Sequence, residues 1–265
     1  KYLNKKNFPY GNKINFNSDL AEQDFQFYKK VDKPLISNIN SANICCLYHG
    51  GSEEVIKEAI SECMKKDVSI GAHISFLDRE NFGRSQVEWN ERIILDLLEK
   101  QMNILLKICK TQNAIITHFK PHGALSNISS NNPRLAEIII SYFKSKYPKI
   151  IILAPALSEL ANASKKAGLK TILEIFADRT YENDGTLTPR ILNGSLITCV
   201  QDVVTNVRTM IEKKAIISRL NLKIPTQFDS ICLHSDTPNS VEISKEICIL
   251  LKSMKIKQKK LTDFF

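Results

Sequence analysis

The stretch GAHISFLDRENFGRS, residues 71–85, decides how the rest of the chain is interpreted. Its first residues and residues 68–70 before them are small and apolar, which is typical of a strand buried inside a sheet. After His73 the stretch becomes polar and titratable, and it includes Arg79 and Arg84. A polar loop at the end of a buried strand is how α/β enzymes commonly build an active site. The alternative is a surface loop with solvated charges, and the rest of the chain decides between the two.

The composition is that of one globular domain. The chain has 265 residues, of which 43% are hydrophobic and 25% charged, and this is enough for one α/β domain with a large core. No apolar run is long enough for a membrane span, and no signal peptide is visible. The seven Cys lack C-x-x-C spacing, which indicates reduced thiols. We therefore expect a single domain over residues 1–265, located in the cytoplasm and without a membrane partner.

The net charge of +9 lies almost entirely at the two ends of the chain. Residues 1–13 carry four Lys and no acid, and residues 252–265 carry five Lys and one Asp. The near-neutral remainder, residues 14–251, lacks the clustered basic face that a nucleic-acid-binding protein needs, so we expect no nucleic-acid partner. We interpret residues 1–12 as an irregular arm and residues 255–265 as a basic tail.

The tail also contains a short motif. Residues 258–265, QKKLTDFF, match the spacing of peptides that dock onto DNA sliding clamps. Matches of this length at a chain end often arise by chance. We expect the two Phe of this segment to pack on the domain instead.

Strands and helices alternate along the chain. Apolar runs predict seven strands, at residues 13–17, 43–48, 68–73, 114–119, 149–154, 171–177 and 230–233. Amphipathic segments predict helices that begin after Ser52 and Asn132, and helices at residues 88–112, 158–167, 201–214 and 240–254. No repeat or linker divides the chain. The alternation predicts a parallel sheet with helices outside it, either closed into a barrel or doubly wound.

Histidines and aspartates gather at the ends of the predicted strands. All five His fall at or just past a strand end, at His49, His73, His118, His122 and His234, and three Asp take the same kind of place, at Asp19, Asp178 and Asp236. Because the ends of parallel strands meet at one face, we predict that these side chains converge there. His118 lies within its segment, and the helix layer is the alternative place for its side chain.

The predicted cluster fits two kinds of chemistry. Histidines and carboxylates suit general acid–base catalysis once their neighbours shift their pKa values. Asp19, His49 and His73 would also form an oxygen–nitrogen ligand set for a divalent metal, although no H-E-x-x-H or C-x-x-C spacing supports it. Basic side chains predicted on the same face could hold phosphate or carboxylate, or could form salt bridges with nearby acids: Lys120, Arg79, Arg84, Arg179 and Arg190.

Six segments together resemble the LamB/YcsF family of 5-oxoprolinase A subunits. They occur in the family's order and span nearly the whole chain between the two ends. The segments are INFNSDLAE (14–22), SANICCLYHGG (41–51), GAHISFLDRENFGRS (71–85), HFKPHGAL (118–125), EIFADRTYENDGTLTPR (174–190) and ICLHSDTPNSV (231–241).

The resemblance implies a seven-stranded (β/α) barrel of the glycoside hydrolase/deacetylase type. It also implies ATP-dependent opening of 5-oxo-L-proline to L-glutamate, in complex with two further subunits. Because the sequence contains no G-x-x-x-x-G-K-S/T and no G-x-G-x-x-G, ATP would be bound without those loops.

The resemblance further suggests roles for individual residues. His73 and His122 become the acid–base candidates, and Asp19 and His49 would orient them or hold a divalent metal. Substrate or phosphate would contact the remaining candidates, which are Lys120, Arg79, Arg84, Asp178 and Arg179.

The chain departs from the family pattern at several positions, which makes it a divergent member. Ala21 and Leu47 stand where Gly is usual, and Ile74 and Leu77 replace two prolines. Gly permits backbone shapes that other residues resist. Two alternatives therefore stay open: a metal-dependent carbohydrate deacetylase on the same type of barrel, and a catalytically impaired partner within the complex.

Overall fold

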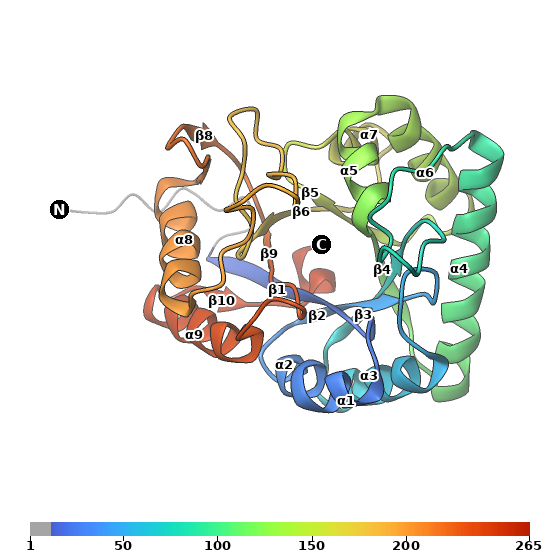
Figure 1. Ribbon diagram of the computed structural model, residues 1–265. Helices are drawn as coiled ribbons and strands as arrows, with labels where there is room; N and C mark the ends of the chain where they lie inside the picture. The colour runs from blue at the N-terminus through green and yellow to red at the C-terminus, as the bar shows by residue number, and fades with distance from the viewer. Residues whose placement is uncertain (1–11) are drawn as a thin grey trace.

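Seven parallel strands close into a barrel in the computed structural model, which describes residues 12–265 (Figure 1). The order around the barrel is β1 (Lys13–Leu20), β2 (Ser41–Cys45), β3 (Ser69–Ile74), β4 (Ile116–Pro121), β5 (Ile151–Pro155), β6 (Thr171–Phe176) and β9 (Ser230–Cys232). β9 pairs back onto β1 and closes the ring. The predicted seven-stranded (β/α) barrel is confirmed. Residues 1–11 of the predicted N-terminal arm lie outside the described residues.

Helices surround the barrel, as Figure 1 shows. The larger ones are α3 (Glu53–Lys65), α4 (Glu91–Gln112), α6 (Pro133–Lys146), α7 (Glu159–Lys166), α8 (Val200–Lys213) and α9 (Ser240–Ser253). Side-chain caps precede some of them: Ser52 accepts from the backbone N–H of Val55, and Asn90 accepts from that of Ile93. The Asn90 cap explains why α4 begins at residue 91 rather than at the predicted residue 88. Among residues 12–265, no helix combines the length and apolar character needed to cross a membrane.

Several smaller elements differ from the prediction. Short helical turns fill the connector between β1 and β2, namely α1 (Phe25–Phe27), a π-helical turn (Tyr28–Asp32) and α2 (Lys33–Ile36). The helix α5 (Gly123–Asn131) and the hairpin of β7 (Ala215–Ile217) and β8 (Lys223–Pro225) were also not predicted. α5 buries little apolar surface, so its sequence lacks the helical apolar period on which the prediction depends.

Strands β1 to β4 alternate between an apolar outer face and a polar inner face. On β4, Phe119 faces outward, where its ring lies 4.2 Å from that of Phe143 on α6. His118 faces inward, and its Nε2 lies 2.8 Å from Asn43 Oδ1 of β2. The helix layer is therefore not the place of His118. A methyl group at Gly71 of β3 would lie 2.2 Å from the His118 ring, so the missing side chain at residue 71 makes room for that ring.

The C-terminal segment is folded onto the barrel, which corrects the interpretation of residues 255–265 as a tail. β10 (Lys257–Gln258) pairs with β1, and the 3-10 helix η2 (Leu261–Phe264) follows. Leu261 and Phe264 are buried in a cluster with Ile151, Leu153 and Ile172. Figure 1 shows the C-terminus within the ring of strands. The interpretation as a tail rested on the lysines of this segment, whereas burial of Leu261 and Phe264 fixes its position on the barrel.

Candidate functional site

A buried ion triad lies in the centre of the barrel. Lys120 Nζ is 3.0 Å from Asp19 Oδ1 and 3.1 Å from Glu174 Oε2, and all three side chains are at most 3% exposed. The same ammonium lies 3.1 Å from Cys232 Sγ. The charge of Lys120 is thus shared by two carboxylates of the chain itself. Its predicted role of binding a substrate anion stays a prediction, and the ammonium is paired within the chain itself.

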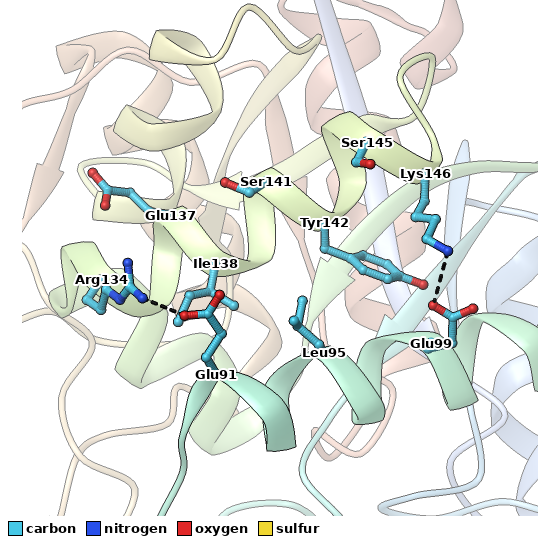
Figure 2. Close-up of a pocket in the computed structure, with 10 residues that line it drawn as sticks. All are labelled: Glu91, Leu95, Glu99, Arg134, Glu137, Ile138, Ser141, Tyr142, Ser145 and Lys146. Carbon is cyan, nitrogen blue, oxygen red and sulfur yellow. Dashed lines mark hydrogen bonds and ion pairs between the residues drawn. The ribbon is translucent and has the colours of Figure 1, made fainter.

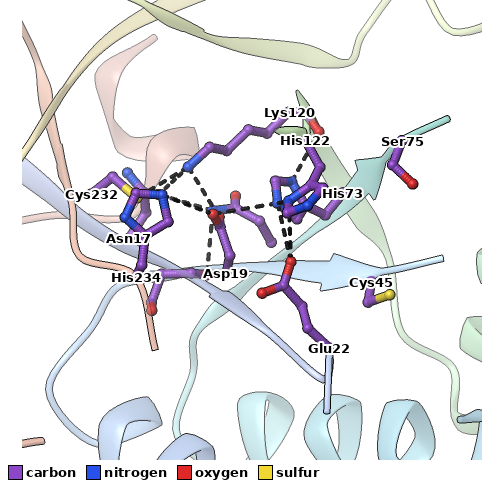
Figure 3. Close-up of polar contacts among 12 residues, drawn as sticks. Asn17, Asp19, Glu22, Cys45, His73, Ser75, Lys120, His122, Cys232 and His234 are labelled. Carbon is purple, nitrogen blue, oxygen red and sulfur yellow. Dashed lines mark hydrogen bonds and ion pairs between the residues drawn. The ribbon is translucent and has the colours of Figure 1, made fainter. Parts of the chain in front are cut away.

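A group of three imidazoles and one carboxylate adjoins this triad. It comprises Glu22, His49, His73 and His122, all of them buried, and we call it the histidine cluster. His73 Nε2 lies 3.0 Å from His122 Nδ1, and Glu22 Oε1 lies 2.8 Å from His49 Nε2. Figure 3 shows Glu22, His73 and His122 pointing toward one another from different elements. His73 Nε2 also lies 3.3 Å from Asp19 Oδ2, which joins the cluster to the triad.

Electrostatics set the charges of these groups. Burial alone would raise the pKa of Asp19, but His73 and Lys120 outweigh it and hold that pKa well below its usual value. Burial likewise opposes the charge of Lys120, yet Asp19 and its other partners hold the Lys120 pKa well above the usual range. In the cluster, burial raises the pKa of Glu22 to about 7 and lowers the pKa of His49. The centre therefore pairs ionised Asp19 with ionised Lys120.

Asp178 and His234 form a second branch of the site. His234 Nδ1 lies 3.0 Å from Asp178 Oδ1, and the hydroxyl of Thr237 donates to the same carboxylate. His234 Nε2 lies 3.8 Å from Asp19 Oδ2, so the branch reaches the triad. Asp178 is fully buried and holds His234 in place rather than facing a ligand directly.

Three of the predicted arginines make different contacts in the structure. Arg179 is buried and donates to the backbone carbonyls of Thr188 and Ser195, so it fixes a loop and does not contact the cluster. Its predicted role in binding substrate stays a prediction. Arg84 pairs with Asp236 at 3.0 Å and stays partly exposed. Arg79 donates three hydrogen bonds to backbone carbonyls of the loop at residues 47–51.

A pocket of about 670 Å³ opens beside the histidine cluster. The buried Glu22 and His49 contribute to its lining, together with Arg79, Arg84 and Asp236. A second hollow, of about 530 Å³, lies between α4 and α6 on the outside of the barrel (Figure 2). Its charges form exposed surface pairs such as Lys146 with Glu99, and it holds none of the predicted site residues. The pocket at the histidine cluster is therefore the candidate functional site.

Two strained residues border this site. Ala21 and Leu47 adopt positive φ angles of 61° and 69°, at positions where the family resemblance leads us to expect Gly. Such a conformation costs a non-glycine residue roughly 1–2 kcal/mol. Ala21 directly precedes Glu22, and the carbonyl of Leu47 accepts a hydrogen bond from Arg79. The strain thus lies at the turns that shape the pocket.

Two residues of the centre were not predicted as site residues. Glu22 follows Asp19 by three positions, just past the end of β1, and this placement was the only signal in the sequence. Glu174 stands inside the otherwise apolar strand β6, where a charge points to a polar barrel interior.

Comparison with known proteins gives the family of this chain. The model of the LamB/YcsF family matches residues 14–265, which is nearly the whole chain. The chain belongs to the LamB/YcsF family. The match covers every element that contributes a side chain to the site and confirms the resemblance in the six segments.

Curated LamB/YcsF relatives are about one third identical to the chain. The 5-oxoprolinase A subunit of Brevibacillus brevis is 33% identical over 234 residues, which cover 88% of this chain and 92% of the relative. That of Clostridium beijerinckii is 34% identical over 244 residues, covering 92% and 96%. Among solved structures, the lactam utilization protein from Thermus thermophilus has a TM-score of 0.84 at 26% identity, covering 93% of this chain and 99% of that one.

Proposed function

We propose that this chain is the A subunit of an ATP-dependent 5-oxoprolinase and contains the site at which the ring of 5-oxo-L-proline is opened to L-glutamate. Full-length relatives named as 5-oxoprolinase A subunits support the substrate. The observation that carries the site is the buried contact between Asp19 and His73, 3.3 Å apart, beside an open pocket. The proposal also includes two further subunits as partners, ATP as co-substrate and a cytoplasmic location.

The reaction needs an activated lactam, because amide resonance protects the ring carbonyl from water. Transfer of a phosphoryl group from ATP to the amide oxygen makes the ring carbon electrophilic. Water then adds to that carbon, the ring C–N bond breaks, and the nitrogen takes up a proton. Phosphate leaves when a second water cleaves the acyl phosphate, which gives the side-chain carboxylate of glutamate.

The residues of the site suit the hydrolytic step. Asp19 is held ionised, so its carboxylate is a fixed negative charge 3.3 Å from His73 Nε2 and not itself the base. His73 is the group of this pair that can accept the proton of the attacking water. Lys120 stabilises the Asp19 carboxylate inside the barrel. His122 and Glu22 adjoin the pair and provide a path on which a proton can return to the ring nitrogen.

The pocket supports the handling of anions. Arg84 is partly exposed there, and Arg79 keeps N–H groups that no carbonyl occupies. The backbone of Gly50, Gly51 and Ser52 leads into the N-terminus of α3 at the pocket wall, where a helix dipole favours negative charge. These groups suit the substrate carboxylate or a phosphoryl group.

Reconstitution tests the proposal. The chain is mixed with the two other subunits, 5-oxoproline and ATP, and glutamate is measured with the chain present and with it left out. We expect glutamate only when the chain is present. A folded chain that assembles with the partners and yields no glutamate would support the alternative of a catalytically impaired partner. Release of acetate from an acetylated sugar by the chain alone would support the deacetylase alternative.

A further inference from the structure

Each imidazole of the histidine cluster has one ring nitrogen committed as a hydrogen-bond donor. His73 Nδ1 lies 3.1 Å from the carbonyl oxygen of Lys120, and His122 Nε2 lies 2.8 Å from that of Phe82. A carbonyl oxygen only accepts, so both nitrogens carry hydrogen. The third ring is His49, and its tautomer follows from the next bond in its network.

His49 Nδ1 lies 2.8 Å from the hydroxyl oxygen of Ser75. That hydroxyl donates its own hydrogen to the carbonyl of Phe76, so it accepts from His49. Nδ1 of His49 is therefore a donor as well, which leaves its Nε2 unprotonated with a free lone pair. All three rings thus direct an unprotonated nitrogen away from their backbone or hydroxyl partner.

The free nitrogens of the three rings lie close to one another and to the Glu22 carboxylate. His73 Nε2 and His122 Nδ1 are 3.0 Å apart, and Glu22 Oε1 lies 2.8 Å, 3.6 Å and 3.3 Å from the free nitrogens of His49, His73 and His122. Two nitrogen lone pairs at this distance repel each other unless a cation lies beside them. The cation can be a proton or a metal ion, and the number of neighbouring donors favours one of the two.

We propose that Glu22, His49, His73 and His122 bind one divalent transition-metal ion of the Zn²⁺ type. The four ligand atoms all lie within 4.8 Å of one another. Two ligands of a tetrahedral ion with bonds of about 2.1 Å are roughly 3.4 Å apart, which is close to the separations in the cluster. A proton can bridge one pair of donors, whereas four donors this close together match the coordination number of such an ion. The rings of His49 and His122 are stacked at 3.8 Å, so one of them would tilt for both nitrogens to reach the ion.

The surroundings of the four donors strengthen this assignment. Histidines that bind metals usually donate their second N–H to a carbonyl, carboxylate or water, which fixes the ring and its tautomer. His73 and His122 donate to carbonyls in this way. Three imidazoles and one carboxylate also suit a borderline ion such as Zn²⁺ better than Mg²⁺ or Ca²⁺, which prefer oxygen ligands.

A second group of potential ligands, Asp19, Cys232 and His234, fits a metal less well. The ammonium of Lys120 already lies 3.0 Å from Asp19 Oδ1 and 3.1 Å from Cys232 Sγ, and it would repel a second cation there. The sequence suggested Asp19, His49 and His73 as ligands. The geometry exchanges Asp19 for Glu22 and adds His122. With an ion bound, Glu22, His73 and His122 would act as its ligands in place of the proton-carrying roles given above, and the Asp19 carboxylate would lie beside His73.

Such an ion, when bound, would act as a Lewis acid toward a water molecule that it takes as a fifth ligand, because its four protein ligands fill a tetrahedral site. This catalytic use rests on the proposed function, but binding of the ion does not. The two can therefore fail separately, and the experiment is performed on the chain alone, without ATP, substrate or partner subunits.

The untagged chain is stripped with a chelator and titrated with Zn²⁺ and, separately, with Mg²⁺. Bound metal per chain is measured by elemental analysis after gel filtration, and the melting temperature is followed in parallel. We expect about one Zn²⁺ per chain, a raised melting temperature and no effect of Mg²⁺. Zn²⁺ binding should weaken at least about tenfold in Glu22→Gln and His49→Asn, and stay unchanged in His118→Asn, which alters a buried histidine outside the cluster.

Wild-type protein that binds no Zn²⁺, or binds it equally well after Glu22→Gln and His49→Asn, would overturn the proposal and leave a shared proton between His73 and His122. If a ligand variant does not fold, the visible spectrum of the wild-type chain loaded with Co²⁺ decides instead. Intense bands of a four-coordinate nitrogen–oxygen site support the proposal, and the weak spectrum of hydrated Co²⁺ contradicts it.

Discussion

The ammonium of Lys120 and the carboxylate of Asp19 form a 3.0 Å ion pair inside the barrel, where each side chain is only 3% exposed. Two carboxylates and one ammonium share this space, since Glu174 lies 3.1 Å from the same Lys120 nitrogen. Removing one member of a buried ion pair destabilises a protein by more than the intact pair stabilises it, because the remaining charge stays desolvated.

Lys120→Met therefore tests the triad. We expect the free energy of unfolding at neutral pH to fall by about 3–5 kcal/mol, measured by urea denaturation. Without the ammonium, the pKa values of Asp19 and Glu174 rise in the folded state above their unfolded values, so the loss should shrink as the pH falls. Lys100→Met is the matched control, because Lys100 forms a 2.7 Å pair with Asp96 at the surface and its loss should have little effect on stability. Equal losses in the two variants would refute the role of burial.

Asp229 provides a pH-dependent prediction outside the site. Burial raises its pKa to about 6, although the backbone N–H of Leu173 opposes the shift. A raised carboxyl pKa means that the folded state binds the proton more tightly, so stability falls as the pH rises from about 4 through 6. Above that pH range, the ionised Asp229 destabilises the folded state by its full amount.

Asp229→Asn should accordingly stabilise the protein by about 1–3 kcal/mol near pH 7.5 and have little effect near pH 4. Urea denaturation at both pH values gives the comparison. Asp184→Asn is the control with the opposite sign, since hydrogen bonds from Thr186 lower the pKa of Asp184. A gain in Asp229→Asn that is the same at both pH values would contradict the expected linkage.

Gly71 and His118 give a prediction about the barrel interior. The methyl group of Gly71→Ala would lie 2.2 Å from the His118 ring, so we expect the variant to lose about 1–3 kcal/mol of stability through overpacking. The double variant with His118→Ser should lose less than the sum of the two single variants, because the smaller side chain removes the clash. Additive losses would show that the two side-chain positions do not interact.

Phe264 and Phe265 are adjacent but differ in burial, at 6% and 48% exposure. Phe264→Ala should cost about 3–5 kcal/mol, because Phe264 fills the cluster inside the barrel. Phe265 contacts Lys170 near the surface, and Phe265→Ala should cost less than about 1 kcal/mol. Thermal or urea unfolding compares the two. A similar small loss in both variants would restore the interpretation of residues 255–265 as a tail.

The sequence predicted the seven strands well because their apolar runs are a strong signal, whereas their closure into a barrel was predicted from the family resemblance. The continuous apolar run at residues 150–153 is typical of a parallel strand covered on both faces, and β5 occupies it. His73 and His122 were predicted to converge because strand ends meet at one face of a barrel. This rule needs only the strand boundaries, so errors of two or three residues did not affect it.

The rest depended on contacts that sequence patterns do not contain. Glu22 reaches His49 only because the chain turns at Ala21, with a positive φ that a non-glycine residue rarely adopts. Arg179 directly follows Asp178, yet its side chain donates to the carbonyls of Thr188 and Ser195 in the loop that follows. The two-residue strand β10 is defined by its pairing with β1, and no local pattern marks it.

The central claim is that the histidine cluster of this chain carries out ring opening. The most direct test is glutamate formation by the reconstituted three-subunit enzyme containing the double variant His73→Gln/His122→Gln. We predict a fall of at least about 10²-fold, the usual contribution of acid–base groups, while gel filtration shows that the complex still assembles. Unchanged glutamate formation by the assembled variant would contradict the account and move the chemistry to one of the partner chains.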